Sequence, residues 1–562
     1  MRLFSTWDIL HRGSYDSVVE ALVTARSLDL GELAAGADSL HPPRLLTDLE
    51  RGVERLAQAI HDGEHVLVFG DYDVDGVVST VLVMDFLQRV NARCSCMLPD
   101  RHTDGYGIKP PAIARAAERG AQLIITVDNG ISAGPAIASA VDAGIDVIVV
   151  DHHQQHGALP PAHSVINPNR TDCGYPFKGL AGVGVAFKLV QAVSEGFMPG
   201  PERRAYLNGL LDLVALGTVA DMAPVLGENR VLIRRGLEIL GRTRRPGLRQ
   251  LKAVARCVDH ALDAASIGFH LGPRINAAGR LKSPHLALDL LSAGEEEAAA
   301  RIAAELDELN GRRRQLQNEG TEEAASLVQT DELARDRLLV VLGESWHLGI
   351  IGLLASNLST RFHRPVVVFT GARDDGTYTG SARSIPAYDI GAGVDHCAEH
   401  LTTHGGHPGA AGMTLPTESF EAFRADLIAH ANAHIDPKAL EPRLTVDLEL
   451  EPRDMGPGTL DQLRQLEPFG RGNELPVFAS MDCEVTSCRR IGRDQRHGKI
   501  GLATGGVQRQ AVWWNNGDVI DELRRGQRVA AAYTLERDNF AGNGAVQLVL
   551  KDLCPLDRER ST

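Results

Sequence analysis

Three aspartates stand at alternate positions directly after an apolar run early in the chain. The stretch HVLVFGDYDVDGVVST covers residues 65–80 and contains Asp71, Asp73 and Asp75, with Gly76 closing the group. Neighbouring carboxylates repel one another and raise each other's pKa, so a group this dense needs compensating positive charge. Bound divalent cations are the simplest source of that charge, and Gly76 would let the chain turn tightly beside them.

Further aspartates and histidines follow other apolar runs. Asp128 lies in LIITVDNGIS, Asp151, His152 and His153 lie in IDVIVVDHHQQH, and Asp221 lies in VALGTVADMAP. If these runs are strands of an open α/β sheet, their carboxyl ends share one edge, where ligands bind. Each group alone has an ordinary alternative, because a lone aspartate after a strand is usually a helix N-cap and a lone D-H-H triplet usually lies on the surface. Together they indicate a metal centre.

The ligand types indicate which metal and which reaction. Carboxylates with one or two imidazoles suit Mn²⁺ or Mg²⁺, whereas a structural zinc site would usually bring thiolates. The 8 cysteines are scattered and form no C-x-x-C pair, so we expect reduced thiols. Bridging carboxylates can hold two ions roughly 3.5–4 Å apart, which clamp the attacking and leaving oxygens of phosphoryl transfer. The predicted chemistry is phosphoester hydrolysis.

The surrounding pattern predicts several domains in a chain of 562 residues. Val/Ile/Leu runs alternate with amphipathic helices from residue 65, as in βαβ units around a parallel sheet. Residues 200–240 look mainly helical, and a long Ala/Glu/Arg segment then predicts an extended helix. A second α/β pattern follows it, and the last part has the short strands and turns of an OB-type barrel. The expected parts are an N-terminal segment (1–64), a parallel-sheet domain (65–294), a connecting helix (295–335), a smaller α/β domain (336–434) and an OB-like domain (435–562).

The charge and hydropathy of the sequence limit which kinds of binding partner we expect. The net charge of −15 argues against bulk affinity for nucleic acid but permits a local basic channel, and arginines cluster in GRTRRPGLRQ, NGRRRQ and RRIGRDQRHGK. Each arginine cluster alone is more typical of a solvated surface. No apolar run is long enough to cross a bilayer, and the N-terminal residues lack the order of a signal peptide, so we expect a cytoplasmic protein without a membrane partner.

Several motifs in register make the chain similar to a known family. DYDVDG, VDNG, VDHH and ALGTVADMAP resemble, in order, the four motifs of the DHH phosphoesterase superfamily. PDRHTDGYG, GPRINAAGRL, SARS and HGGHPGAAG narrow the resemblance to RecJ-type single-stranded-DNA-specific exonucleases, from about residue 40 to the C-terminus. The resemblance implies an α/β multidomain fold, with a DHH domain and a smaller DHHA1 domain joined by a long helix around a cleft, followed by an OB-type barrel.

The resemblance also implies roles for individual residues around two Mn²⁺ or Mg²⁺ ions. The direct ligands would be Asp73, Asp75, Asp128, His152 and Asp221, with Asp128 as the bridging candidate. Asp71 and Asp151 would orient these ligands, and alternation along the end of the strand would turn Asp71 away from the ions. His153 would contact the scissile phosphate, where an imidazole N–H stabilises transition-state charge.

Substrate contacts are implied in the same way. Arg101, Arg280, Ser381 and Arg383 match positions that contact phosphate, including the 5′-terminal one, and Arg274, Asn276, Gly405, Gly406 and His407 are further candidates. Arginine suits this task because its planar donors engage phosphate oxygens in pairs. His347 matches a family pattern too, although a capping role is the alternative. Trp513, Trp514 and Tyr533 are candidate stacking platforms, with burial in the barrel core as the alternative.

The implied activity is a metal-dependent 5′→3′ exonuclease that hydrolyses single-stranded DNA to 5′-mononucleotides in DNA recombination and repair. The resemblance implies a single-strand-binding protein and a RecQ-type helicase as partners, and we expect a monomer. Two alternatives stay open at this point. One is a DHH phosphodiesterase for short oligonucleotides, cyclic dinucleotides or pyrophosphate, and the other is a catalytically inactive scaffold that binds single strands.

Overall fold

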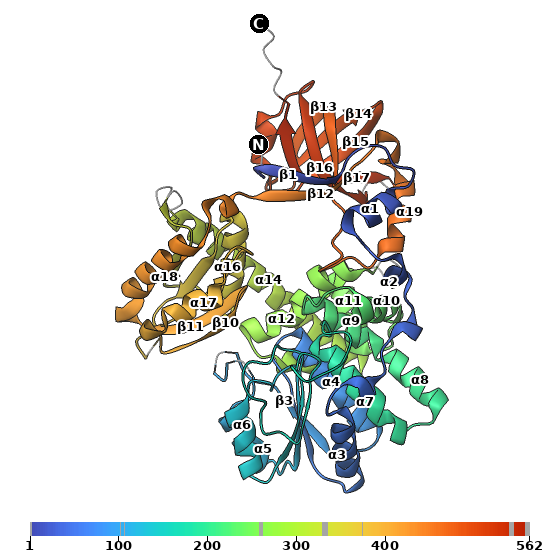
Figure 1. Ribbon diagram of the computed structural model, residues 1–562, viewed down its shortest axis with the longest axis vertical. Helices are drawn as coiled ribbons and strands as arrows, with labels where there is room; N and C mark the ends of the chain where they lie inside the picture. The colour runs from blue at the N-terminus through green and yellow to red at the C-terminus, as the bar shows by residue number, and fades with distance from the viewer. Residues whose placement is uncertain are drawn as a thin grey trace. The chain divides into compact units, whose positions relative to one another are not determined.

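The computed structural model describes residues 3–101, 103–105, 107–257, 262–328, 335–373, 375–538 and 545–556 (Figure 1). The chain divides into two compact units, each of which is described by itself. The larger unit comprises residues 35–435 together with 470–473. The smaller unit comprises residues 1–34, 436–469 and 474–562.

The first half of the larger unit is built on a five-stranded parallel sheet with strand order β3-β2-β4-β5-β6. The strands are β2 (Val66–Phe69), β3 (Cys94–Met97), β4 (Leu123–Val127), β5 (Asp146–Val150) and β6 (Ser164–Ile166). Successive side chains face opposite sides, so Val66 and Val68 enter one core while Leu67 and Phe69 enter another. Both faces are covered by helices, which explains why the strands are apolar throughout. Helices α5 (Pro110–Glu118) and α6 (Gly134–Asp142) cover one face, and α3 (Leu49–His61), α4 (Val74–Arg89) and α7 (Gly182–Val193) cover the other (Figure 1).

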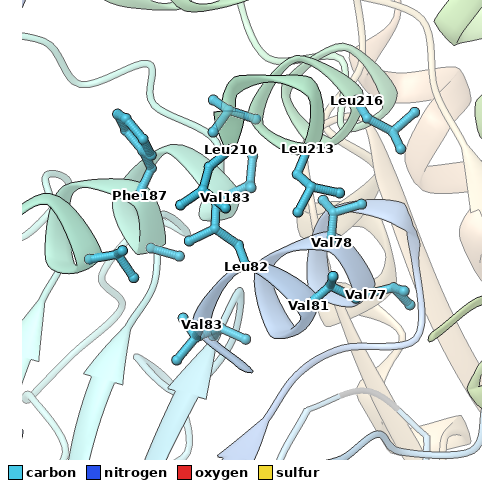
Figure 2. Close-up of a cluster of buried hydrophobic side chains, with 14 of the residues drawn as sticks. Val77, Val78, Val81, Leu82, Val83, Val183, Phe187, Leu210, Leu213 and Leu216 are labelled. Carbon is cyan, nitrogen blue, oxygen red and sulfur yellow. The ribbon is translucent and has the colours of Figure 1, made fainter. Parts of the chain in front are cut away.

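A helical layer continues the core on the α4 side. Figure 2 shows valines and Leu82 of α4 meeting Val183 and Phe187 of α7 and the leucines of the next helical segment. All are buried, so the helices that carry the acidic motifs are held by close packing. The further helices of this layer are α8 (Gly200–Gly209), α9 (Leu211–Ala220), α10 (Gly227–Gly241), α11 (Pro246–Ala255), the π-helical turn η5 (Ser266–Leu271), α12 (Gly272–Leu281) and α13 (His285–Ser292).

The extended helix expected after residue 295 is present as α14 (Glu296–Leu327). It leads to a five-stranded mixed sheet of order β10-β11-β9-β8-β7, in which only β7 and β8 are parallel. The strands are β7 (Leu339–Gly343), β8 (Val366–Thr370), β9 (Thr377–Arg383), β10 (Thr403–His407) and β11 (Ala410–Pro416). Its helices are α16 (Ile351–Phe362), α17 (Ile390–His396) and α18 (Phe420–His434).

The smaller unit contains the expected five-stranded barrel. Strand β13 pairs with both β14 and β16, which closes the order β13-β14-β15-β17-β16 on itself. The barrel strands are β13 (Phe478–Ile491), β14 (His497–Thr504), β15 (Val507–Trp513), β16 (Arg528–Arg537) and β17 (Val546–Pro555). Of the three aromatic candidates for stacking, Trp513 and Tyr533 are buried in the barrel core and Trp514 is 44% exposed. The alternative of burial in the barrel core therefore applies to Trp513 and Tyr533.

The N-terminal residues also fold in the smaller unit, which the sequence did not predict. Strand β1 (Thr6–His11) pairs in parallel with β12 (Arg443–Glu449), which in turn pairs with β13 (Figure 1). Helices α1 (Val18–Arg26), α2 (Leu30–Ala34) and α19 (Pro457–Leu463) complete the unit. Among the described residues, no helix is both long and apolar enough to cross a membrane.

Candidate metal centre

The first acidic motif lies at the carboxyl end of β2, although its aspartates are not on the strand. The strand ends at Phe69, Asp71 lies in the loop, Asp73 is the N-cap of α4, and Asp75 lies in its first turn. Asp73 accepts a hydrogen bond from the N–H of Gly76 (3.0 Å). The expectation that strand alternation separates the three side chains was therefore wrong in its cause, because the start of a helix sets their directions.

The other acidic groups arrive from three further elements. Asp128 follows β4 with a left-handed backbone (φ 62°), and Asp151 follows β5, as the strand-end pattern predicted. Asp221 does not follow a strand, because the apolar run before it is helix α9. It reaches the same place because α9 packs against α4, which carries Asp75.

His152 lies at the centre of the acidic groups. Its Nε2 is 3.1 Å from Asp128 Oδ1, 3.9 Å from Asp221 Oδ2 and 4.0 Å from Asp75 Oδ2. This nitrogen is buried and makes no hydrogen bond of ordinary geometry among the described residues. Several carboxylate oxygens around one buried imidazole nitrogen are the arrangement that a bound cation would satisfy.

The start of helix α7 fixes the carboxylate of Asp75 in this group. Both of its oxygens accept backbone hydrogen bonds at the start of α7, from Gly182 (2.7 Å) and Val183 (3.0 Å). A side chain at position 182 would lie 2.7 Å from Asp128 Oδ1, and one at Gly217 would lie 2.7 Å from Asp75 Oδ1. Glycine at both positions lets α7 and α9 approach the carboxylates. Each Asp75 oxygen has a second lone pair, which stays available for a metal.

Asp151 supports the two histidines. Its Oδ1 accepts hydrogen bonds from the backbone N–H of His152 (2.7 Å) and from Nδ1 of His153 (2.7 Å), and its Oδ2 accepts from the N–H of Ile131 (2.9 Å). Burial raises the pKa of the Asp151 carboxyl, but the hydrogen bond and charge of His153 outweigh this and lower it. Conversely, burial lowers the pKa of His153, and Asp151 raises it to about 9. His153 is therefore cationic at neutral pH, and its side chain is 44% exposed.

Four other carboxyls of this group, those of Asp71, Asp75, Asp128 and Asp221, have raised pKa values. Burial and the charge of Asp73 raise the pKa of Asp71 to about 8. Burial and Asp221 raise the pKa of Asp75 to about 7, burial and Asp73 raise that of Asp221 to about 7, and Asp128 is raised as well. Burial and the neighbouring imidazole lower the pKa of His152. Bound cations would remove this repulsion.

The ligand atoms form three overlapping sets that fit divalent cations. Within each set the ligand atoms lie within 4.8 Å of one another. The sets are Asp71, Asp73 and Asp128; Asp75, His152 and Asp221; and Asp128, His152 and His153. Oxygen donors with one or two imidazoles suit Mn²⁺ or Mg²⁺, and Asp128 belongs to two sets, as a bridging ligand would. We refer to these residues together with Asp151 as the carboxylate centre.

A group of like positive charges lies in the same unit. It consists of Arg101, Arg280, Arg313 and Arg383, and we call it the arginine cluster. Burial and the three other arginines lower the pKa of Arg280 to about 9, and burial and Arg101 lower that of Arg383. Such mutual repulsion would be relieved by an anion, and arginine forks suit phosphate.

Contacts orient each member of the arginine cluster. Arg101 stacks on the ring of Tyr72, with 3.9 Å between its guanidinium carbon and the ring centroid. Arg280 donates to the carbonyl of Gly349 (3.0 Å). Arg383 donates to the carbonyl of Ala382 (2.7 Å), and Ser381 lies beside it, with 3.4 Å between its Oγ and Arg383 Nη1.

Sequence reasoning missed Arg313. It stands on α14, where Asn310 and Gln317 accept hydrogen bonds from its guanidinium (both 2.6 Å). The motif NGRRRQ was interpreted as a solvated surface, because three consecutive arginines in a helix do not reveal which of them faces inward. The helical spacing of Asn310, Arg313 and Gln317 on one face is the signal that was available.

The other substrate candidates differ in what they contact. Arg274 pairs with Asp307 (2.9 Å), which occupies its guanidinium, and Asn276 is half-buried on α12. Gly405, Gly406 and His407 lie on the exposed strand β10, and burial together with Arg383 and His153 lowers the pKa of His407. His347 accepts a hydrogen bond from the N–H of Gly349 (3.0 Å), which favours the capping alternative.

Comparison with known protein families identifies the class of each of three domains. The model of the DHH family, N-terminal domain, matches residues 65–218, the model of the DHHA1 domain matches residues 335–433, and that of the RecJ OB domain matches residues 446–552. A parallel sheet with an Asp/His centre at its edge is thus a DHH-type domain.

Whole-chain comparisons define the family. The single-stranded-DNA-specific exonuclease RecJ of Dickeya dadantii is 37% identical over 93% of this chain and 93% of its own, and that of Escherichia coli is 35% identical over the same shares. RecJ of Thermus thermophilus in complex with Mn²⁺ has a TM-score of 0.82 at 27% identity, covering 98% of this chain and 80% of that one. The chain belongs to the RecJ family of single-stranded-DNA-specific exonucleases.

Proposed function

We propose that this protein is a metal-dependent 5′→3′ exonuclease that hydrolyses single-stranded DNA to 5′-mononucleotides, in DNA recombination and repair. The observation that carries the proposal is the convergence of Asp75, Asp128 and Asp221 on the buried Nε2 of His152, in the unit that also holds the arginine cluster. Cations and a phosphodiester are the two ligands that these opposite charges would bind.

The proposed ligands of two Mn²⁺ or Mg²⁺ ions are Asp73, Asp75, Asp128, His152 and Asp221. The ions would polarise the phosphoryl group and lower the pKa of water. Asp128 is proposed to bridge, because its atoms belong to two ligand sets. Asp71 and Asp151 are proposed to orient the ligands, and the carboxylate of Asp151 holds the imidazole of His153 through Nδ1.

His153 is proposed to hold the scissile phosphate. Its Nδ1–H is directed to Asp151, and its raised pKa keeps a proton on the other ring nitrogen at neutral pH. A cationic imidazole beside the carboxylate centre can donate to a phosphoryl oxygen as negative charge grows in the transition state. Its partial exposure leaves room for that contact.

The arginine cluster is proposed to hold the 5′-terminal phosphate and so to set the direction of hydrolysis. Arg101, Arg280 and Arg383 come from three separate elements and repel one another, which makes this a favourable place for a doubly charged terminal phosphate. Ser381 would add a hydroxyl donor. Arg274, Asn276, Gly405, Gly406 and His407 are proposed to contact the strand more weakly.

The barrel of the smaller unit is proposed to bind the incoming strand, with Trp514 as its exposed aromatic side chain. The domain boundaries given by the sequence, the action as a monomer, and the partnership with a single-strand-binding protein and a RecQ-type helicase remain proposals that follow from family resemblance.

One assay tests the proposed activity. A 5′-labelled single strand, the matched duplex and a short oligomer are incubated with Mn²⁺ or with EDTA, and the products are separated by size. We expect mononucleotides from the 5′ end of the single strand, with Mn²⁺ only. Binding without cleavage would instead identify a scaffold, and cleavage of the short oligomer alone would identify a phosphodiesterase for small substrates.

A further inference from the structure

The two most exposed large apolar side chains of the described residues both belong to the surroundings of Asp221. Met222 is 67% exposed and directly follows it in sequence, and Phe269 is 79% exposed on the π-helical turn η5. This turn packs on the end of α9, since a Cβ at Gly268 would lie 4.0 Å from Cγ1 of Val219. Exposing whole apolar side chains is unfavourable, so two beside one ligand residue call for an explanation.

The backbone in both places is unusual as well. Met222 adopts the left-handed conformation (φ 58°), which a residue other than glycine takes up only at a cost, because its Cβ is crowded there. Phe269 stands in a π-helix, a rare element that is frequent at functional sites. The chain thus exposes an apolar and an aromatic side chain at two places where the backbone departs from regular structure.

An arginine lies over the same loop. Residues 470–473 fold with the larger unit, and the N–H of Val225 donates to the carbonyl of Arg471 (2.8 Å). The guanidinium of Arg471 donates to the carbonyl of Met222 (3.4 Å) and is itself exposed. A side chain at Gly470 would lie 2.5 Å from Val225, so glycine there permits the close contact.

We propose that Met222, Phe269 and Arg471 form a nucleotide platform, which binds the nucleotide on the 3′ side of the scissile phosphate. The proposal rests on the proposed function. Phe269 would stack on the base, Met222 would offer a polarizable apolar contact, and Arg471 would bind the following phosphate. Stacking on a ring face accepts every base, as an enzyme that removes nucleotides in turn requires.

The position of the platform follows from the two flanks of the carboxylate centre. Arg101 stacks on the ring of Tyr72, which directly follows Asp71, at the flank proposed to take the 5′-terminal phosphate. Arg471 donates to the carbonyl of Met222, which directly follows Asp221, and Asp221 belongs to the ligand set with Asp75 and His152. A strand whose first phosphate lies at Arg101 and whose scissile phosphate lies at the ions would place its second nucleotide at the Asp221 flank.

Binding of labelled single strands to the full chain in EDTA tests the platform without hydrolysis. The strands are an intact thymidine oligomer and one of equal length with abasic residues at its 5′ end. We expect Phe269→Ala to weaken binding of the intact strand roughly 10-fold and to leave the abasic strand unchanged, with Phe269→Trp close to wild type. We expect Arg471→Gln to weaken both strands about 3-fold and to lower the salt dependence of binding by about one phosphate contact.

The controls are Val141→Ala, a 51% exposed apolar residue on α6, and Arg361→Gln, an exposed arginine on α16. Neither should change the affinity. Wild-type affinity for the intact strand in Phe269→Ala, or an equal loss on the abasic strand, would overturn the platform. Failure of the proposed function would look different, because the wild-type protein would then leave the single strand uncut in Mn²⁺ whatever these variants bind.

Discussion

The larger unit contains two regions of unbalanced charge that have opposite sign. In the carboxylate centre, burial and neighbouring carboxylates raise the pKa values of Asp71, Asp75 and Asp221. In the arginine cluster, burial and neighbouring arginines lower the pKa of Arg280 to about 9. Pairing the two regions with each other would relieve both. The charge of Arg101 lowers the pKa of Asp71, yet the net shift of that pKa is upward to about 8, so each region keeps a charge that a ligand of the opposite sign would balance.

The two regions also differ in how they are held. Backbone N–H groups fix the carboxylates, as at Asp75 and Asp151, so their geometry belongs to the strand ends and helix starts. The arginines come from a loop, two helices and a strand that are distant in sequence. We infer that the carboxylate centre governs turnover and the arginine cluster governs recognition of the strand end. The predictions below can separate these roles.

The largest expected effect follows from removing the shared ligand. Asp128→Ala takes away the carboxylate that belongs to two ligand sets, so kcat should fall on the order of 10⁴-fold. Binding of single-stranded DNA in EDTA should change by less than about 2-fold, because Asp128 is not in the arginine cluster. Single-turnover kinetics with Mn²⁺ and fluorescence anisotropy measure the two quantities. Normal turnover in the variant would refute the site.

Removing the support of the histidines should have a smaller effect. Asp151→Asn turns one of two accepting oxygens into a donating amide. These oxygens accept from the backbone N–H groups of His152 and Ile131 and from Nδ1 of His153, so the loop that carries both histidines and the imidazole of His153 lose their support. We expect Mn²⁺ affinity or kcat to fall roughly 10–100-fold. Isothermal titration with Mn²⁺ checks the first quantity. Asp142→Asn, at the end of α6, is the matched control and should behave as wild type.

An arginine variant should change recognition and leave turnover intact. Arg383→Gln removes one fork of the arginine cluster, so KM for a 5′-phosphorylated single strand should rise about 10-fold, with kcat little changed. A strand with a 5′-hydroxyl should show almost no difference between variant and wild type. Equal losses on both strands would show that Arg383 does not read the terminal phosphate. Arg361→Gln serves as the control.

The smallest effect concerns stability without metal. The folded-state pKa values of Asp75 and Asp221, about 7, lie above the usual value of 3.8, so the folded state binds more protons than the unfolded state. Relative to an Asp75→Asn/Asp221→Asn variant, the metal-free protein should lose stability as pH rises from about 4 to about 8, by a few degrees in Tm. Saturating Mn²⁺ should reverse the difference at pH 8. Calorimetric Tm values across this range provide the measurement.

The sequence allowed the candidate site residues to be predicted where they stand in short motifs after apolar runs. Asp128 and Asp151 were found because the carboxyl ends of parallel strands meet at one edge, which is a property of the fold class. Asp221 was grouped with the strand-end aspartates although its segment was predicted to be mainly helical, and the run before it is helix α9. Its place in the site depends on the packing of α9 against α4, which the local pattern does not give.

Residues that act through long-range packing escaped the sequence. Gly182, whose N–H binds Asp75, looks like any helix glycine until α7 is placed against the strand ends. Arg313 and Arg471 stood in ordinary arginine-containing stretches. Only the packing of α14 brings Arg313 to the arginine cluster, and only the folding of residues 470–473 with the larger unit brings Arg471 to Met222. The pairing of β1 with β12 joins residues more than four hundred positions apart, for which local pattern carries no signal.

The sequence by itself determined the chemistry, because the types of side chain at the ends of apolar runs limit which ions and which reactions they can serve. It also determined the class of each part, since the periods of strands and helices are local properties. Only the tertiary structure decided which carboxylates share His152, which arginines repel one another, and which apolar side chains stay in solvent. These are properties of distance and burial, and both depend on the whole packed chain.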